Sequence, residues 1–251
     1  MSDSARRRYL DEFASSIGVA RTDVPSTHVL IEDSRAGSNL IVGYVFDAIT
    51  VVRAAPEHAD LVMPLHTSER SRTHEELRDW APEIGWVDFD GSLSHVVDRH
   101  AVRDAEVPSG LQAVRLEPNG ADNERIVSWL TSAHPDDVEA ADFDVDELDD
   151  RMVALVDESE QIVAVASSYA TDEVPQFEDI GVIVCRNARG RGLGRVVVRQ
   201  LLDDLHVDDQ LGLYRCNWSN PWSRQLALSL GFEEILSLIA LCPEGDPKAA
   251  G

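Results

Sequence analysis

The sequence predicts a mixed α/β protein built around a β-sheet, and three observations support this class. An apolar, β-branched run at residues 178–185 carries hydrophobic side chains on both faces, which is typical of a buried central strand. A glycine-rich turn and an amphipathic helical stripe (Val198, Leu201, Leu202, Leu205) follow it directly. Two more apolar runs, 151–156 and 161–168, flank a short polar segment, as the strands of a hairpin do.

Residues 1–108 are predicted to form an N-terminal α/β module. Apolar residues recur at helical spacing over 10–17 and 61–65, and Thr73 with Glu76 forms the sequence pattern of a capping box that opens a third helix. Strands are predicted from apolar runs at 29–32, 40–46 and 49–53. The segment Pro108-Ser109-Gly110 is punctuation typical of a boundary between domains.

Residues 109–251 are predicted to form the second domain. Its helices are expected at 122–133, around the stripe that ends at Leu205, and from Asn220-Pro221 to Gly231. Asparagine is a favoured N-cap, proline suits the first helical position, and glycine ends helices. Its strands are expected at 111–116, 151–156, 161–168, 178–185, 211–216 and 232–241.

Charge indicates the setting of the protein more than its partner. The 251 residues include 46 acidic and 22 basic side chains, for a net charge of −24, and the acids are spread along the chain. A solvated acidic surface is typical of a protein from a high-salt cytoplasm, where salt screens the self-repulsion. Nucleic acid is disfavoured as a partner, because phosphate contacts need a basic face. No apolar stretch approaches the ~20 residues of a membrane span, and no secretory signal is recognised, so we expect a cytoplasmic protein.

No metal site is predicted. The three cysteines are scattered, and the histidines have no recognisable ligand spacing. Cys185 is interpreted as a small buried hydrophobe rather than a nucleophile. The five tryptophans are expected in the core, although Trp218 and Trp222 flank the start of the last helix.

One basic island interrupts the acidic chain. Residues 186–199 contain five arginines, three glycines and no acid. A glycine-rich turn into a helix exposes main-chain N–H groups that have no helical partner, and the helix dipole favours an anion there. A phosphate site is therefore favoured over a plain surface turn. The turn lacks the Gly-Lys-Ser/Thr of a P-loop, and its glycines do not have the Gly-x-Gly-x-x-Gly spacing.

The island resembles the acyl-CoA pyrophosphate motif of the GNAT N-acyltransferase superfamily, Arg/Gln-x-x-Gly-x-Gly/Ala. Arg189, Gly192 and Gly194 match it. The segment from Asn220 through Ser223 and Leu226 to Gly231-Phe232 is similar to the superfamily's second conserved helix. The resemblance covers about residues 110–240 and implies a GNAT-like acyl-CoA-binding fold, so the N-terminal module could be substrate-shaping or a degenerate GNAT-like half.

The resemblance also implies where acetyl-CoA would bind. The pantetheine arm would lie along the backbone of Val182, Ile183 and Val184, and Asn220 and Ser223 would contribute from the second helix. The diphosphate would sit on the main chain of Arg189, Gly190, Arg191, Gly192, Leu193, Gly194 and Arg195.

Glu178 and Asp179 are the candidates for the catalytic base. Glu178 lies where many members of the superfamily carry a catalytic glutamate, and Asp179 matches a variant spacing. Adjacent strand residues face opposite ways, so at most one can point into the cleft, and both could instead be solvated strand-end acids. The tyrosine that commonly serves as general acid is replaced by Ala227, and Tyr214 lies on a neighbouring strand.

The implied activity is transfer of an acetyl group from acetyl-CoA to a primary amine by direct attack in a ternary complex. The acceptor could be a small molecule or a protein N-terminus, and a homodimer is left open. The alternative is an acyl-CoA sensor that kept the phosphate site and lost turnover, which Ala227 favours.

Overall fold

The computed structural model describes residues 4–66, 72–132, 135–139, 141, 143–149 and 151–246. Spatial contacts divide the chain into two compact units that alternate along the sequence. The first unit is Met1–Tyr9, Val96–Tyr214 and Trp222–Glu233, and the second is Leu10–His95, Arg215–Pro221 and Glu234–Gly251. The predicted division into an N-terminal module, residues 1–108, and a second domain, residues 109–251, stays a prediction.

The first unit contains the predicted hairpin and the predicted buried strand. Its strands lie in the order β9-β8-β7-β6-β5. The pairs β5–β6, β6–β7 and β7–β8 are antiparallel, whereas β8 and β9 run parallel. Their bounds are β5 (Leu111–Leu116), β6 (Arg151–Asp157), β7 (Ile162–Ala170), β8 (Phe177–Val184) and β9 (Leu211–Asn217).

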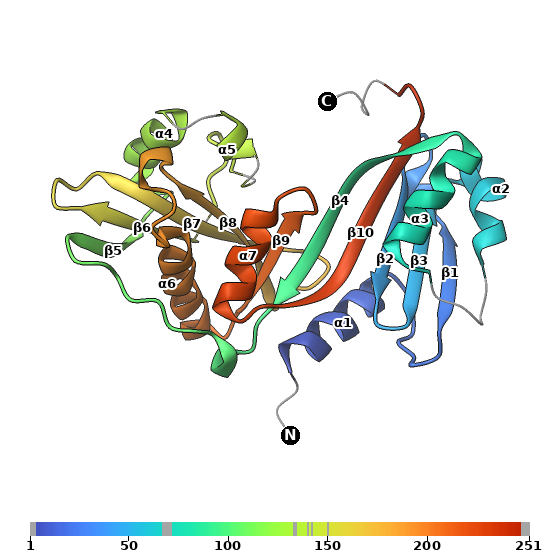
Figure 1. Cartoon of the computed structure of the whole chain (residues 1–251), viewed down its shortest axis with the longest axis horizontal. Coiled ribbons are helices and arrows are strands. Elements are labelled where there is room, and N and C mark those ends of the chain that lie inside the picture. The colour runs from blue at the N-terminus through green and yellow to red at the C-terminus, as the bar shows by residue number, and fades with distance from the viewer. Residues whose placement is uncertain are drawn as a thin grey trace. The chain divides into compact units, whose positions relative to one another are not determined.

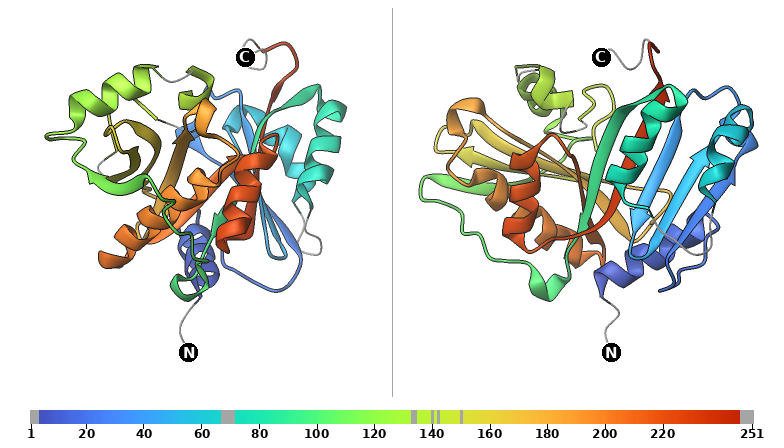
Figure 2. Two further views of the ribbon diagram at one scale, coloured as in Figure 1. Left: turned by 60° about the vertical axis from the view of Figure 1, so that its left-hand side comes forward. Right: turned by 45° about the vertical axis from the view of Figure 1, so that its right-hand side comes forward.

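Helices cover both faces of this sheet (Figures 1 and 2). Helices α4 (Asn123–Ser132) and α5 (Pro135–Glu139) lie on one face, and α6 (Leu193–Val207) packs on the other against β6, β7 and β8. Ile126 and Leu130 of α4 are buried in a cluster with strand residues that include Val165 and Ile183. Helix α7 (Pro221–Leu230) follows β9, just as α6 follows β8.

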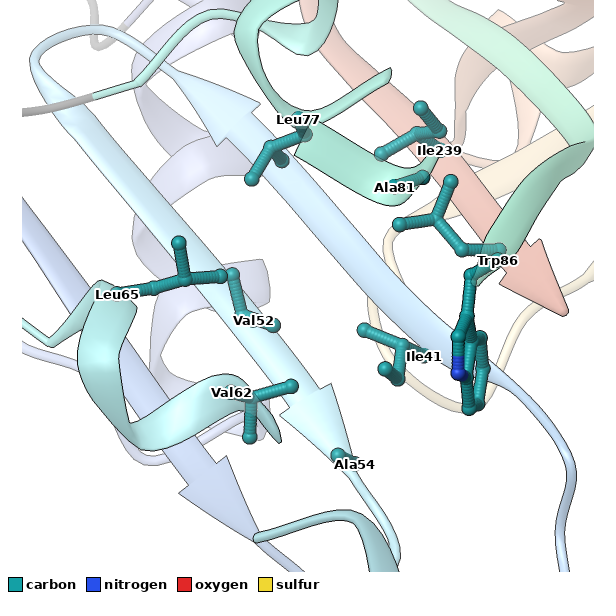
Figure 3. Close-up of a cluster of buried hydrophobic side chains, with 10 residues drawn as sticks. Ile41, Val52, Ala54, Val62, Leu65, Leu77, Ala81, Trp86 and Ile239 are labelled. Carbon is teal, nitrogen blue, oxygen red and sulfur yellow. The ribbon is translucent and has the colours of Figure 1, made fainter. Parts of the chain in front are cut away.

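The second unit has its own sheet and core. Its strands lie in the order β1-β3-β2-β10-β4, with β1 and β3 parallel. Figure 3 shows the core, where Leu77 and Trp86 pack with aliphatic residues such as Ile41, Val52 and Ile239. The bounds are β1 (Ser26–Ile31), β2 (Ile41–Phe46), β3 (Ile49–Ala54), β4 (Trp86–Val96), β10 (Glu233–Pro243), α2 (Ala59–Val62) and α3 (His74–Trp80). Helix α1 (Ala5–Ser16) lies near the start of the chain and, like β9, contains a boundary between the two units.

The predicted mixed α/β class is confirmed, and so are most of its elements. Thr73 and Glu76 form both hydrogen bonds of the capping box at α3. Strand β4 was not predicted, because its sequence WVDFDGSLSHV mixes charged and small residues with apolar ones. Helix α5 has only five residues, too few for a period to show. None of the helices in the described part of the chain combines the length and apolar character that a bilayer span needs.

Candidate functional site

The basic island forms a tight turn from the carboxyl end of β8 into α6. Gly190 and Gly192 have φ values of +74° and +76°, a left-handed conformation that glycine adopts without strain. Nothing lies within 4 Å of the position that a Cβ would take at either glycine, so the turn is open on that side. Gly194 is different, because a Cβ there would lie 2.7 Å from Leu226 Cδ1 of α7. The third glycine therefore lets the two helices pack closely.

The first turn of α6 presents unpaired main-chain donors. The N-cap is Gly192, which has no side chain to accept a hydrogen bond from the turn. Among the described residues, the structure gives no acceptor to the N–H groups of residues 190–195. Helix α3, by contrast, satisfies its first turn with the Thr73 capping box. The start of α6 therefore has the free donors and the dipole that an anion requires.

The arginines of the island differ in their partners. Arg189 donates from Nε to Val184 O at 3.1 Å and pairs through NH2 with Asp137 Oδ2 at 2.7 Å. Arg186 donates to the same Asp137 oxygen at 3.0 Å. Arg195 donates to the main-chain oxygen of Asp104. The side chain of Arg189 thus stabilises the turn through Val184 O and Asp137. The main-chain N–H groups of residues 190–195 remain able to bind a ligand.

Asp137 of α5 is held as a carboxylate by these arginines. Its burial would by itself raise its pKa, but the hydrogen bonds from Arg189 and Arg186 outweigh burial and lower the pKa below the ordinary 3.8. The pair Asp137–Arg189 connects α5 to the turn that follows β8. This contact ties the two faces of the sheet together at the carboxyl end of β8.

Strand β8 has a free edge directly before the turn. It pairs with β7 along its whole length, from Glu178 to Val184. With β9 it pairs only over Phe177–Asp179, so residues 180–184 have no strand partner on that side within the described residues. Cys185 donates its N–H to Val163 O of β7, and main-chain groups alternate along a strand. Val182 and Val184 therefore present their main chains to the free edge, whereas Ile183 faces β7.

Glu178 lies on the α6 face in an ion-pair network. Its Oε2 accepts from Ser168 Oγ at 2.6 Å and from Arg151 Nε at 3.3 Å. Arg151 also pairs with Asp204 at 2.9 Å and Asp208 at 2.8 Å, both in or next to α6. Burial would lower the pKa of Arg151, but hydrogen bonds with Asp208 and Asp204 and the charge of Glu178 raise it. The Glu178 carboxylate is committed to holding α6 on the sheet.

Asp179 lies on the opposite face of the sheet, the face that also carries Ile183 and the α4 residues packed with it. Its Oδ2 accepts a hydrogen bond from Tyr169 OH at 3.2 Å, and Tyr169 is its direct cross-strand neighbour on β7. Its Oδ1 accepts the N–H of Ile180 at 3.1 Å. On the same face, the main chain of Ala141 packs closely over Gly181. A Cβ at position 181 would lie only 2.4 Å from the Ala141 oxygen, so this contact requires glycine. Both acids are buried, so neither is the solvated strand-end acid that the sequence left open.

The start of α7 carries the remaining predicted residues. The helix begins at Pro221, directly after Asn220, whose N–H donates to Asn217 O at 2.9 Å. Ser223 Oγ lies 2.9 Å from the hydroxyl of Tyr214, which is fully buried. Ala227 is buried as well and offers no polar atom.

The expectation that all five tryptophans lie in the core is wrong for Trp222. Its side chain is 80% exposed, because the first turn of α7 extends past the residues that bury the rest of the helix. Trp86 is buried as expected. Within the described residues, no group of three or more histidine, cysteine and acidic side chains is placed to hold a metal ion.

Three residues of the site escaped the sequence reasoning. Tyr169 contacts Asp179 and Arg151 contacts Glu178 because the sheet brings their strands together. No local pattern in the sequence predicts these two pairs. Asp137 lies 52 residues before Arg189 in an acidic stretch that was interpreted only as solvated surface. The polar end of the otherwise apolar β7 run, Ser167-Ser168-Tyr169, is the signal that could have pointed to Tyr169.

Comparisons with known proteins place this site in a family. Residues 123–232 match the family model described as Acetyltransferase (GNAT) family, which includes β8, the glycine turn, α6 and α7. A GCN5-related N-acetyltransferase from Kribbella flavida is similar in structure, with a TM-score of 0.50 and 15% identity over 79% of this chain and 69% of that one. A GCN5-related N-acetyltransferase from Sphaerobacter thermophilus is similar as well, with a TM-score of 0.50 and 16% identity over 76% of this chain and 67% of that one. At these identities the structural likeness shows the fold. No curated protein matches the sequence.

Proposed function

Because residues 123–232 are a GNAT acetyltransferase domain, we propose that the protein transfers an acetyl group from acetyl-CoA to a primary amine by direct attack in a ternary complex. One observation carries the proposal. The free edge of β8 leads straight into the open glycine turn and the uncapped start of α6. The free strand edge can pair with an extended arm that contains amide groups, and the start of α6 can bind the diphosphate attached to that arm.

The residues of the turn fit a CoA thioester. Gly190 and Gly192 leave space beside the main chain, and the N–H groups from Gly190 to Arg195 are free to hold a diphosphate. Val182 can pair with the pantetheine amides through its main chain and Val184 through its N–H, since the Val184 oxygen already accepts from Arg189, whereas Ile183 is committed to β7. Acetyl-CoA supplies the activated acyl group. The chain holds donor and amine in line, which can account for most of the acceleration.

We assign the base to Asp179 rather than Glu178. Asp179 lies on the face that α4 and α5 cover, where its Oδ2 accepts from Tyr169 OH and its Oδ1 accepts from the N–H of Ile180. Glu178 is paired with Arg151 on the other face. In this proposal Asp179 accepts the proton of the incoming ammonium group, and Tyr169 holds the carboxylate in position. A main-chain N–H on the free edge of β8 stabilises the oxyanion.

The departing thiolate receives no proton from position 227, where Ala227 is buried. Tyr214 does not replace it in this proposal, because its hydroxyl is engaged with Ser223 Oγ. A CoA thiol is acidic enough to leave without help from a side chain. The sensor alternative rests on the same observation, and turnover with any amine decides between the two.

The test is calorimetric titration of the protein with CoA, in molar KCl to suit the acidic chain. Gly192→Ala adds a methyl group to the open turn, and Gly37→Ala is its matched control, since Gly37 has φ +80° and equally empty surroundings. An alanine in the left-handed conformation should lower the stability of both variants by about 1–2 kcal/mol. Only Gly192→Ala should weaken CoA binding, by about tenfold or more, which corresponds to roughly 1.4 kcal/mol. Equal CoA affinities in the two variants would refute the site.

A second variant tests the role of Arg189. Arg189→Glu breaks the brace to Val184 O and Asp137 and brings a negative charge to the turn, so CoA binding should fall by at least the same factor. CoA release from acetyl-CoA across a panel of amines then separates enzyme from sensor. Tight CoA binding without release for any amine would support the sensor.

A further inference from the structure

Trp222 is the most exposed of the five tryptophans. Its side chain is 80% exposed on the first turn of α7. The helix buries Ala227 and Leu230, so its hydrophobic contacts do not need Trp222. An exposed indole offers a flat aromatic surface on which another ring can stack.

Two contacts show where the first turn of α7 lies within the first unit. Leu226 of α7 covers Gly194 in the first turn of α6, as its 2.7 Å distance from a Cβ there shows. Further along, Leu202 of α6 and Phe232, just after α7, both cover Gly212, at 2.6 and 3.6 Å from a Cβ at that position. The two helices therefore run in the same direction, and their N-termini lie at the same end.

Trp222 lies on the same stripe of α7 as Leu226, the residue that contacts the start of α6. It lies four residues before Leu226, one helical turn, so the two side chains share a face of the helix. Leu226 contacts the first turn of α6, and Trp222 lies one turn nearer the N-terminus. Trp222 therefore extends past Gly194 toward the end where the open glycines of the turn lie.

Arg191 is a free cation in the same turn. It is exposed, lies between Gly190 and Gly192, and has no hydrogen bond or ion pair within the described residues. The other arginines of the island are engaged, with Asp137, Asp104 or Asp203. In a chain with a net charge of −24, a guanidinium without an acidic partner is conspicuous.

We propose that Trp222 stacks on the adenine base of CoA and that Arg191 binds its 3′-phosphate, so that these two residues select the nucleotide end of the donor. This rests on the proposed function, which places the diphosphate on the turn between them. Beyond its diphosphate, CoA carries one aromatic base and one phosphate dianion. An exposed indole and a free guanidinium are the side chains that bind those two groups.

Three ligands separate the two contacts. CoA has both groups, 3′-dephospho-CoA lacks the phosphate, and 4′-phosphopantetheine lacks the whole nucleoside. Trp222→Ala should weaken CoA and dephospho-CoA by about fivefold or more and leave phosphopantetheine unchanged. Arg191→Met should weaken CoA alone and leave dephospho-CoA unchanged. CoA should quench the tryptophan fluorescence of the wild-type protein, whereas phosphopantetheine should not. In Trp222→Phe, which lacks this tryptophan, the quenching by CoA should be much smaller.

Leu228→Ala is the control, because Leu228 is another exposed apolar residue of α7, at 41%, on a different side of the helix. It should bind all three ligands like the wild type. The proposal is overturned if Trp222→Ala binds CoA normally, or if it loses phosphopantetheine to the same extent. If wild-type protein binds none of the three ligands, the proposed function itself fails, and that result is distinct from a selective failure of the two variants.

Discussion

Glu178 and Asp179 are adjacent on β8, yet their carboxylates lie on opposite faces of the sheet with opposite kinds of partner. Glu178 Oε2 accepts from Ser168 Oγ at 2.6 Å and faces the guanidinium of Arg151. Asp179 Oδ2 accepts from the neutral hydroxyl of Tyr169 at 3.2 Å. Glu178 therefore belongs to the ion-pair network that joins α6 to the sheet, and we propose the base role for Asp179.

The first prediction separates these two roles by rate. Asp179→Asn should slow acetyl transfer by about 10²-fold or more, because an amide cannot accept the proton of the ammonium group. Glu178→Gln should keep the rate within a few-fold and lower the stability instead. Initial rates of CoA release at saturating acetyl-CoA and amine measure the first effect, and thermal unfolding measures the second. The reverse pattern would assign the base to Glu178.

The second prediction concerns the network around Arg151. Arg151→Met leaves Glu178, Asp204 and Asp208 without their shared cation, and breaking such a buried pair costs roughly 3 kcal/mol. Arg115→Met is the matched control, since Arg115 also pairs with Asp204 but its side chain is 63% exposed. It should cost less than about 1 kcal/mol. Urea unfolding gives both values, and equal losses would show that the network is not structural.

The third prediction follows from the lowered pKa of Asp137. Because the folded state favours the carboxylate, its contribution to stability is complete above the ordinary pKa of 3.8 and is lost as the pH falls through the lower, folded value. Asp137→Asn lacks that titration. The difference in unfolding free energy between wild type and variant should stay constant at neutral pH and shrink in acid below 3.8. A difference that does not vary with pH would show that Arg186 and Arg189 do not hold this carboxylate.

The fourth prediction concerns salt. With 46 acidic and 22 basic residues, the folded chain repels itself, and salt shortens the range of that repulsion from about 30 Å at 0.01 M to about 3 Å at 1 M. The thermal midpoint should therefore rise as KCl is added over this range. NaCl at equal ionic strength should act similarly if screening is the cause. A midpoint that falls with salt would contradict the high-salt setting proposed from the composition.

The glycine turn could be predicted because its chemistry is local. The left-handed glycines, the absence of a capping side chain and the helical stripe after it all lie within residues 189–205, and each leaves a mark in the sequence. The same holds for the capping box of α3 and for the start of α7 at Pro221. The partners of these elements could not be predicted in the same way. Strand pairing and helix packing alone bring Asp137, Tyr169 and Arg151 to the site.

The sequence by itself determined the class of fold, the glycine turn before α6 and the two acids at the start of β8, because backbone conformation and residue periodicity are properties of short segments. Tertiary structure alone decided which acid faces α4 and α5, how far β9 follows β8, and that Trp222 stays in water. Strand register causes the difference, since a shift of one residue would exchange the faces of Glu178 and Asp179. That register is set by cross-strand contacts between segments far apart in the chain.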